Sequence, residues 1–505
     1  MLTTKTTSQK DQICLTVLSL VLLGGLCFAQ PAVTLSTKTG PPTTKLLVSG
    51  TGFPASTAVG IYFDITEFAL TATNATGSFS KVEIQVPASA LPGVNWVTAV
   101  VDVTGEAAQA PFSVRTNWAQ LGFGPARTGE NPYENVLSPA TAGNLGLLWS
   151  HTTGGPVLGS PAVGNGLVYI GSDDNSVYAL NANTGAKRWQ FTTGGPVESS
   201  PAVANGVVYV GSNDFNVYAL NARTGALLWQ FTTGGVVATA PAVVSGVVYV
   251  TSGDRFLYAL DASTGAELWF LFPPVYSVSS SPTVANGVLY VTSTDANIFA
   301  FSTGTSPAPL WEVSSGREQF GVGTLAVANG VVYAAPDTLD VYAVTASTGA
   351  TLWSVTPNGG AESSPAVANG MVYTTSNPFL GILSALNART GGLEWTFPAG
   401  AFGPGFACSP TVANGVVYVA DVDGNIFALN AGNGAQLWQF TTANSSVQSS
   451  PAIANGVVYF GSDDGSVYAF STSNTPSASP SITMAFGRCV ATRATSMESC
   501  TSATL

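Results

Sequence analysis

The sequence contains little charge and almost no histidine. Only 8% of its 505 residues are charged, and 15 Lys and Arg stand against 27 Asp and Glu, which gives a net charge of −12 and a pI of about 4.4. The phosphate backbone repels so acidic a chain, which excludes nucleic acid as a partner. His151 is the only histidine. A Ser-His-Asp triad or a metal site of several histidines is therefore not expected, and His151 is expected to lie on a strand surface.

Cysteine is also scarce. Of the five cysteines, Cys14 and Cys27 lie in the apolar N-terminal segment, Cys408 stands alone in a repeat, and Cys489 and Cys500 are close to the C-terminus. These spacings fit neither a disulfide framework nor a zinc site, although a disulfide between the last two stays open.

No apolar run is long enough to span a membrane. The longest covers residues 13–28, which is 16 residues where about 20 are needed. Lys5 and Lys10 precede it, and the small residue Ala29 ends it. This pattern predicts a secretory signal peptide over residues 1–29, a mature chain that starts near Gln30, and no transmembrane span in that chain. Cys27 follows Leu26 rather than a small residue, which favours secretion over lipid anchoring.

Eight of the ten tryptophans recur at nearly constant spacing. Their successive separations are 40, 40, 40, 42, 42, 42 and 43 residues, and the positions are Trp149, Trp189, Trp229, Trp269, Trp311, Trp353, Trp395 and Trp438. A period near 40 with strand-like segments in each unit indicates a β-propeller, in which each repeat forms one blade. We expect these tryptophans to dock each blade on its neighbour rather than to bind sugars.

Each unit contains four strand-like segments joined by three turns. The first turn is Asn-Gly in seven units and Ser245-Gly246 in the eighth, which favours a type I′ hairpin. Runs such as 207–210 are apolar on both faces, so both faces must be covered by neighbouring blades. The first strand contains Ser, Pro and Ala, and its proline is acceptable if the edge toward the channel is free.

The number of units predicts how the ring closes. The first-strand sequence occurs eight times, but the tryptophan strand around Trp149 precedes the first of them, and no such strand follows the last. The sequence therefore predicts an all-β chain with an eight-bladed propeller of four-stranded antiparallel blades over residues 145–470, in which the N-terminal strand 145–151 completes the last blade.

Other segments flank the propeller. Residues 31–115 alternate in polarity over 45–50, 58–65, 77–86, 95–103 and 110–114, which predicts a small β-sandwich. Within it, SGTGFPASTAVGIYFD resembles the opening of bacterial immunoglobulin-like domains. Residues 117–144 form a leader, and residues 471–505 are rich in Ser, Thr and Pro, which predicts a disordered tail.

The repeat SPAVANGVVYVGSxDxxVYALNAxTGxxLWQF resembles the pyrroloquinoline-quinone-like (PQQ-like) propeller repeat, including its turn of Ala, Thr and Gly followed by Trp. This resemblance implies the propeller fold and two kinds of activity. Quinoprotein dehydrogenases hold a quinone over Ca²⁺, and the alcohol dehydrogenases among them have adjacent cysteines, which this sequence lacks. Other members, such as the outer-membrane β-barrel assembly lipoprotein, are non-catalytic scaffolds, and the short uniform repeats resemble these more closely.

The sequence thus favours a secreted, periplasmic or cell-surface protein, expected to be a monomer, that binds a protein or cell-envelope component without catalysis. No catalytic residue, metal ligand or cofactor is expected. A quinone-dependent dehydrogenase and a carbohydrate-binding surface protein remain as alternatives, and loop aromatics would favour the latter. These aromatics are Phe215, Phe256, Tyr276, Phe320 and Phe379.

A few polar residues are candidates for a site. Glu198 and Glu362 could line the channel mouth but are expected to be solvated rim residues, because they lie four blades apart. Residues 421–425 resemble the start of a calcium loop, yet a hairpin turn is expected there. Arg127 could reach the channel, and hydrogen bonding of the leader across a propeller face is the favoured role.

Overall fold

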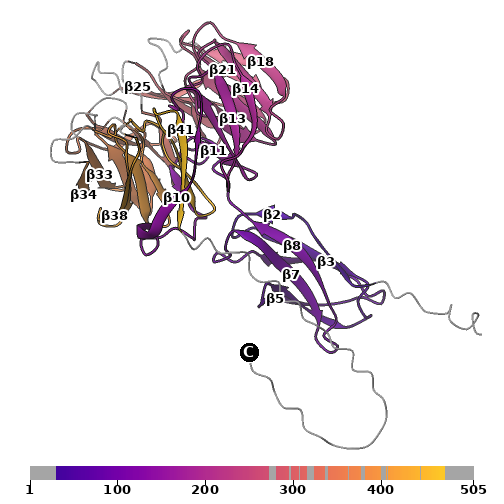
Figure 1. Ribbon diagram of the computed structural model, residues 1–505. Coiled ribbons are helices and arrows are strands. Elements are labelled where there is room, and N and C mark those ends of the chain that lie inside the picture. The colour runs from indigo at the N-terminus through magenta and orange to yellow at the C-terminus, as the bar shows by residue number, and fades with distance from the viewer. Residues whose placement is uncertain are drawn as a thin grey trace, which may run out of the picture.

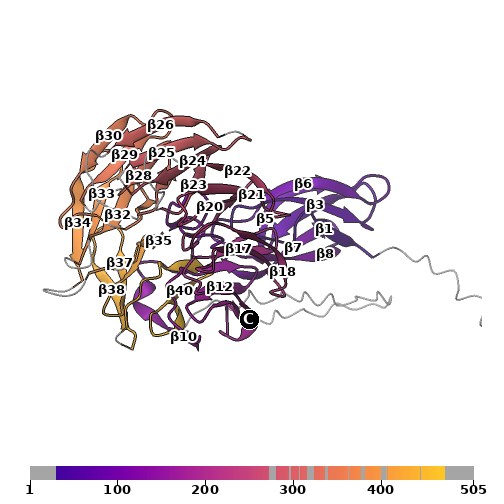
Figure 2. The same cartoon turned by 90° about the horizontal axis from the view of Figure 1, so that it is seen from above.

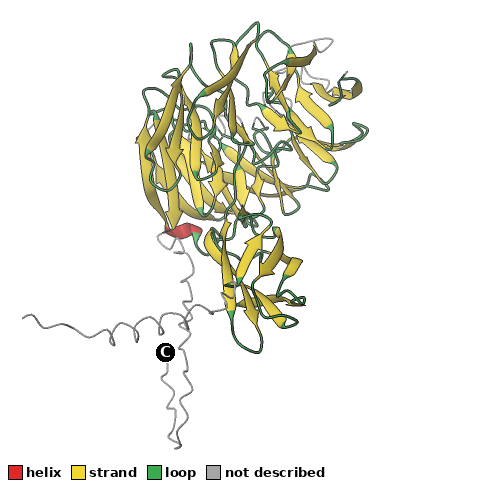
Figure 3. Cartoon of the chain, turned by 90° about the vertical axis from the view of Figure 1, so that its right-hand side faces the viewer, coloured by secondary structure: helices red, strands yellow, loops and turns green. Residues whose placement is uncertain are grey.

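The structure is a computed structural model. It describes residues 30–472, except 272–279, 295–296, 306, 315–322, 336–338, 362, 377–380, 400–404, 407 and 444. The predicted signal peptide therefore lies outside the described residues, as does the predicted tail from residue 473 onward, whereas Ser471 and Thr472 belong to the last strand of the propeller. Within them the chain forms strands joined by turns and one short 3-10 helix, η1 (Ala142–Asn144), which Figure 3 shows near the junction of the two parts of the molecule.

The N-terminal part consists of two packed sheets. The five-stranded sheet has the order β2-β8-β7-β4-β5 and the three-stranded sheet the order β1-β3-β6. The strands are β1 (Ala32–Leu35), β2 (Thr39–Gly40), β3 (Lys45–Thr51), β4 (Ala58–Phe63), β5 (Thr66–Ala72), β6 (Phe79–Gln85), β7 (Gly93–Val101) and β8 (Ala107–Val114). Alternate residues such as Leu46, Val48, Ile61 and Phe112 are buried between the sheets.

Five of these strands lie where the alternating pattern indicated, and three do not appear in the sequence-based set. β1 and β2 are short, and β5 is an edge strand that exposes Phe68 and Leu70. Because β5 does not bury one face consistently, its sequence lacks the alternation that reveals a half-buried strand.

The larger part consists of eight sheets within the described residues, each built on four antiparallel strands. In one of them the short strand β9 (Glu130–Asn131) pairs parallel with the innermost strand β35 as a fifth strand. We number the blades by chain order of their innermost strands. The innermost strands are β11 (Ala162–Gly164), β15 (Ala202–Ala204), β19 (Ala242–Val244), β23 (Thr283–Ala285), β27 (Ala326–Ala328), β31 (Ala366–Ala368), β35 (Thr411–Ala413) and β39 (Ala452–Ala454). The second strands are β12 (Leu167–Ser172), β16 (Val207–Gly211), β20 (Val247–Thr251), β24 (Val288–Thr292), β28 (Val331–Ala334), β32 (Met371–Thr375), β36 (Val416–Ala420) and β40 (Val457–Gly461).

The outer half of each blade follows the same order. The third strands are β13 (Ser176–Asn181), β17 (Asn216–Asn221), β21 (Leu257–Asp261), β25 (Asn297–Ser302), β29 (Val341–Thr345), β33 (Ile382–Asn387), β37 (Asn425–Asn430) and β41 (Ser466–Thr472). The outermost strands are β14 (Lys187–Thr192), β18 (Leu227–Thr232), β22 (Glu267–Leu271), β26 (Pro309–Ser314), β30 (Thr351–Val355), β34 (Leu393–Pro398), β38 (Gln436–Thr441) and β10 (Leu145–Thr152). Figure 2 shows the blades following one another around the ring in chain order.

The two ends of the array meet in blade 8. β10 pairs antiparallel with β41, with Trp149 opposite Ala469, and Figure 1 shows these strands side by side although they come from opposite ends of the propeller sequence. Each innermost strand contacts the next, and β39 contacts β11. The closing strand predicted from the position of Trp149 is therefore present in the structure.

The first turns have the backbone geometry that their sequences predict. Asn205 has φ 51° and Gly206 φ 80°, and the equivalent pairs in the other blades, including Ser245-Gly246, also have positive φ at both positions. Positive φ at both central residues is the requirement of a type I′ turn, which asparagine and glycine meet with little strain.

The repeated tryptophans lie between neighbouring blades. The indole Nε1 of Trp149 donates a hydrogen bond of 2.9 Å to the carbonyl of Ala182 in blade 1, and that of Trp229 donates one of 3.0 Å to Ala262 in blade 3. Trp189, Trp311, Trp353 and Trp395 make the equivalent bond to the next blade. A side chain on Gly185 would collide with the Trp149 ring. Glycine in the third turn therefore leaves room for the indole ring to pack directly against the backbone.

Trp269 and Trp438 differ from the other six. They precede blades 4 and 8, which lack the turn of Ala, Thr and Gly, and neither indole nitrogen has an equivalent acceptor among the described residues. Tyr418, on the same blade as Trp438, is fully buried, and its hydroxyl has no hydrogen-bond partner. The docking contact therefore depends on the turn in the next blade as well as on the tryptophan.

Replacing either Trp149 or Trp229 by alanine should destabilise the protein to a similar extent. Both side chains are 8% exposed, and each removal leaves a large cavity between blades, at a cost of about 3 to 5 kcal/mol. Thermal unfolding measures the effect. Leu148→Ala is the control, because Leu148 is 41% exposed beside Trp149. An unchanged Tm for Trp149→Ala with a lowered Tm for Trp229→Ala would show that β10 does not close the ring.

Candidate functional site

The leader forms a circle inside the propeller. It begins at blade 1, where the N–H of Trp118 donates to the Val163 carbonyl (2.9 Å) and the Val163 N–H donates back (2.7 Å). It ends at blade 8, where the Asn131 side-chain amide donates to the Ile453 carbonyl (2.9 Å). Between these points it makes a hydrogen bond to each innermost strand in turn.

Most of these bonds use the same position in every blade. The N–H groups of Val203, Val284, Val327, Val367 and Val412 donate to the backbone carbonyls of Ala119, Pro125, Ala126, Thr128 and Gly129 over 2.7–2.9 Å. In blade 3 the Gln120 side chain replaces the backbone and bonds both backbone groups of Val243. The leader therefore ties all eight blades together at the end of the ring where the Asn-Gly turns lie.

This arrangement corrects one expectation. The edge of the innermost strands toward the channel was expected to be free, but the middle residue of each strand bonds the leader, through the valine N–H in blades 1 to 7 and through the Ile453 carbonyl in blade 8. The proline remains tolerated because it precedes that donor. Leader aromatics fill the same end, with the rings of Trp118 and Phe123 5.4 Å apart and those of Phe123 and Tyr133 6.2 Å apart.

The leader also joins the propeller to the sandwich. Thr116, the residue just before the leader, donates its N–H to the Asn455 side chain (2.8 Å). Within the leader, the Asn135 amide donates to the carbonyls of Ala88 and Ala90 in the sandwich. Glu134 accepts from Gly456 of blade 8 and from Val136 and Leu137. Burial raises the pKa of the Glu134 carboxyl, which these three hydrogen bonds partly oppose.

The opposite end of the channel has an acidic arc, which we define as Asp463, Asp173 and Glu198 of blades 8, 1 and 2. The Glu198 carboxylate accepts a hydrogen bond from the Asn213 amide (2.7 Å), and that of Asp463 accepts one from Gln448 (2.8 Å). One carboxylate oxygen of Asp173 and one of Asp463 are buried without a hydrogen-bond partner. Burial, followed by repulsion from Glu198, Asp463 and Asp174, raises the pKa of Asp173.

No basic side chain neutralises this arc within the described part of the chain, where Lys45–Glu83 in the sandwich is the one ion pair. Uncompensated carboxylates at the mouth of a narrow channel attract cationic groups. Glu198 is partly buried and hydrogen-bonded, and Glu362 lies outside the described residues.

The remaining candidate residues from the sequence lie on strands and turns of the propeller or outside the described residues. His151 lies on β10 with its ring 6.1 Å from that of Tyr178. Asp421 is buried and accepts hydrogen bonds from Asp423 and Asn425 within the turn between β36 and β37, the expected hairpin. Phe215 is 45% exposed on a turn of blade 2, whereas Phe256 packs against Tyr258 and Phe270. Tyr276, Phe320 and Phe379 lie outside the described residues.

The residues at the mouth do not fit a quinone held over a metal ion. Across the described ranges, no three His, Cys, Asp or Glu side chains lie close enough together to hold a metal. The chain has no adjacent cysteines, and its buried Cys408 is a free thiol whose sulfur accepts from the Ala420 N–H. The arc instead presents three carboxylates, of which Glu198 and Asp463 are bonded to amides and none is paired with a cation of the described residues, an arrangement that suits a cationic ligand.

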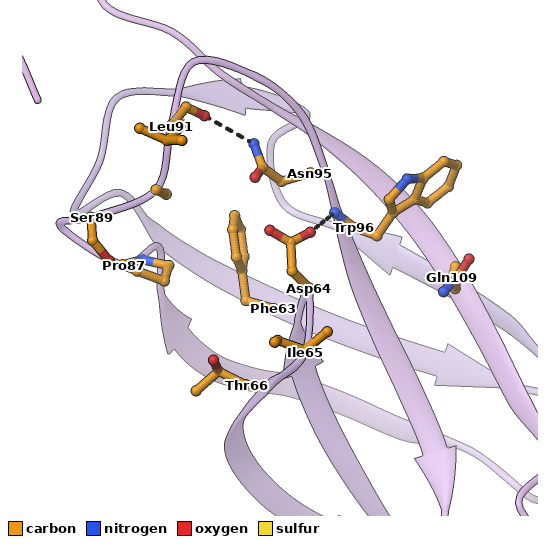
Figure 4. A pocket seen from close by; sticks show the side chains of 11 residues that line it. Phe63, Asp64, Ile65, Thr66, Pro87, Ser89, Leu91, Asn95, Trp96 and Gln109 are labelled. Atoms are coloured by element: carbon orange, nitrogen blue, oxygen red, sulfur yellow. Dashed lines mark hydrogen bonds between the residues drawn. The ribbon is translucent and has the colours of Figure 1, made fainter. Parts of the chain in front are cut away.

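The sandwich has a separate pocket of about 430 Å³ (Figure 4). Its lining is mostly apolar and includes Phe63, Ile65, Leu91 and Trp96. The Asp64 carboxylate accepts a hydrogen bond from the Trp96 N–H and the Asn95 amide donates to the Leu91 carbonyl, as the dashed lines show. Such a pocket can receive an apolar side chain or a small ring.

The ring of tryptophan-docked, four-stranded blades closed by an N-terminal strand defines a PQQ-like β-propeller. The family model described as outer membrane protein assembly factor BamB matches residues 140–241, 213–307, 303–396 and 380–476, which is more than half of the chain. The chain therefore belongs to this PQQ-like repeat family.

Individual relatives match over shorter stretches. A BamB from Moranella endobia is 34% identical over 124 residues, which cover 24% of this chain and 31% of the relative. A tetrathionate hydrolase from Acidithiobacillus ferrooxidans is 33% identical over 140 residues, which cover 22% and 27%. The chain thus spans less than a third of the length of these curated relatives.

Solved structures share the fold. BamB from Moraxella catarrhalis superposes with a TM-score of 0.57 at 20% identity, covering 65% of this chain and 99% of that one. A europium-containing methanol dehydrogenase superposes with a TM-score of 0.60 at 15% identity, covering 70% and 98%. A search of the described residues finds no helix with the length and apolar character needed to cross a membrane.

The arc makes stability depend on pH. The pKa of Asp173 is raised in the folded state, so the folded state binds this proton more tightly than the unfolded state does. The stabilisation that the proton provides is complete below the ordinary pKa of 3.8 and is lost as pH rises through the raised pKa. Asp173→Asn should therefore raise Tm at pH 7, with a smaller gain near pH 3.5. Thermal unfolding at both pH values checks this, with the exposed Asp102→Asn in the sandwich as control. Equal gains at both pH values would contradict it.

Proposed function

We propose that this chain is a non-enzymatic scaffold that binds a partner protein through the channel mouth of its propeller. The acidic arc supports this most directly, because Asp173 and Asp463 keep buried carboxylate oxygens without partners and no cation of the described residues neutralises them. A segment carrying Lys or Arg would supply both charge and hydrogen-bond donors there.

The position of the leader also favours the end of the propeller with the acidic arc as the binding face. The leader and its aromatic side chains lie at the end of the ring near the Asn-Gly turns, so the arc lies at the end that the leader does not line. The sandwich pocket adds a second, apolar contact site on the same chain. Membership of a family described as an outer membrane protein assembly factor agrees with a role in protein assembly.

The proposal includes the setting of the protein. We propose that residues 1–29 direct export, that the mature chain is secreted, periplasmic or at the cell surface as a monomer, and that residues 31–115 form an immunoglobulin-like sandwich. The propeller over 145–470 and the leader over 117–144 then present the binding face.

Binding of a cationic probe tests the proposed face. Fluorescence anisotropy of a labelled octalysine peptide should show saturable binding that weakens as salt rises, and an octaglutamate peptide should not bind. The triple variant Asp173→Asn, Glu198→Gln, Asp463→Asn should lose roughly tenfold or more in affinity, since about 1.4 kcal/mol of lost attraction suffices for that factor.

A charge-matched variant separates the arc from net charge. Asp102→Asn, Glu106→Gln and Glu267→Gln remove three exposed acidic charges elsewhere. This variant should bind octalysine nearly as well as the original protein. Equal losses in both triple variants would mean that attraction is general and the arc is not the site. Stoichiometric binding of pyrroloquinoline quinone with Ca²⁺, seen by its absorbance, would favour a dehydrogenase instead.

A further inference from the structure

A ring of hydroxyl groups surrounds the axis just inside the innermost strands. The residue before the first-strand proline is serine in most blades, and its Oγ accepts a hydrogen bond from the backbone N–H of the preceding blade. These bonds join Ser160 to Ser200, Ala240 to Ser281, Thr324 to Ser364, Ser364 to Ser409, Ser409 to Ser450 and Ser450 to Ser160, over 2.8–3.1 Å.

Each of these serine oxygens already accepts a bond, and none donates its proton to another described residue. A hydroxyl that accepts one bond can still donate its proton and accept one further bond. The ring is therefore a set of donors that lack acceptors.

Arg127 brings a positive charge to the same place. Its side chain is 4% exposed, and its guanidinium donates to the carbonyls of Pro282 (2.7 Å), Ala240 (3.0 Å), Pro241 and Leu121 (both 3.3 Å). Burial lowers the pKa of Arg127 to about 9, so it stays charged at neutral pH. Carbonyl dipoles satisfy its N–H groups, but no carboxylate of the described residues pairs with its charge. Buried charges without a counter-ion are costly.

A small cavity lies between the guanidinium and the hydroxyls. Its volume of about 20 Å³ suits one water-sized sphere. Residues of the leader line one side of the cavity and residues of blades 5 to 8 line the other, and no acidic residue is among them. The lining residues that matter are Arg127, Gly129, Thr324, Ser364, Ser409 and Ser450.

We propose that this cavity binds one monatomic anion, of the kind represented by chloride, between Arg127 and the hydroxyls of Ser364, Ser409 and Ser450. The lining holds the positive charge of Arg127 and no carboxylate, which disfavours a cation. The volume excludes phosphate or a carboxylate. An anion supplies the missing counter-charge, whereas a water molecule would have to accept from all of these donors while leaving the charge of Arg127 unpaired.

The anion links the leader to the far side of the ring. Arg127 bonds carbonyls of blades 3 and 4, while the serines belong to blades 6, 7 and 8. Filling the cavity therefore adds a contact across the axis that the hydrogen bonds of the leader do not make.

Bromide locates the site directly. In crystals of the full protein soaked in sodium bromide, anomalous scattering should show one peak between Arg127 and Ser409. An ordered water there, with bromide absent or only on the surface, would overturn the proposal.

Thermal unfolding gives a solution test. Replacing sodium gluconate by sodium chloride at equal ionic strength should raise the Tm of the original protein by roughly 1 to 3 °C, as expected for a ligand that binds only the folded state. Ser409→Ala should lose at least half of this rise, and Arg127→Gln, where it folds, should lose all of it. Ser200→Ala is the matched control, since Ser200 accepts the same inter-blade bond but does not line the cavity, and it should keep the full rise. An identical response in Ser409→Ala and Ser200→Ala would overturn the proposal.

Discussion

A blade of this propeller is apolar on both faces, and this constraint governs the whole structure. Val208 and Val210 of blade 2 have no exposed surface, and the intervening Tyr209 is 3% exposed on the other face of the sheet. Such a sheet is stable only between two neighbours, so an array of blades must close into a ring. The shared acceptors make the docking specific, because Tyr209 and Trp229 both donate to the carbonyl of Ala262 in the next blade.

Two segments of the chain, β10 and the leader, hold the ring closed. β10 completes blade 8 from the N-terminal side, which joins the first and last repeats through a full set of strand bonds. The leader then follows the inside of the ring and bonds every innermost strand. With one end of the channel occupied in this way, the acidic arc at the other end becomes the natural place for a partner. Closure and the proposed function are thus linked through a single segment of 14 residues from Trp118 to Asn131.

The repeat itself was predictable from the sequence. The regular tryptophans, the Asn-Gly turns and the unmatched strand at Trp149 could be recognised because each depends on a particular residue type at a particular position. The circular leader was not predictable, because it binds through the carbonyls of Ala119, Pro125 and Gly129, and backbone groups leave no mark in a side-chain pattern. Only the favoured role of Arg127, hydrogen bonding within that region, anticipated it.

Other features became visible only with the ring assembled. Asp173 and Asp463 occupy the same turn position of different repeats, and they interact because blade 8 is next to blade 1. Trp269 and Trp438 look equivalent to the other tryptophans, yet the blade that follows each lacks the alanine turn. The serines before the first-strand prolines look like ordinary small residues in the sequence, whereas in the ring each oxygen accepts a bond from the neighbouring blade.

Native-state hydrogen exchange tests most directly whether leader, closing strand and blades form one cooperative unit. The decisive groups are the valine amides bonded to the leader, such as Val203, Val284 and Val367 in three separate blades. If the ring is closed as described, these amides exchange only through global unfolding, and their exchange free energies equal each other and the unfolding free energy. Exchange of one blade's valine at a clearly lower free energy than the others would show that blades open independently and would contradict the closed, leader-bound ring.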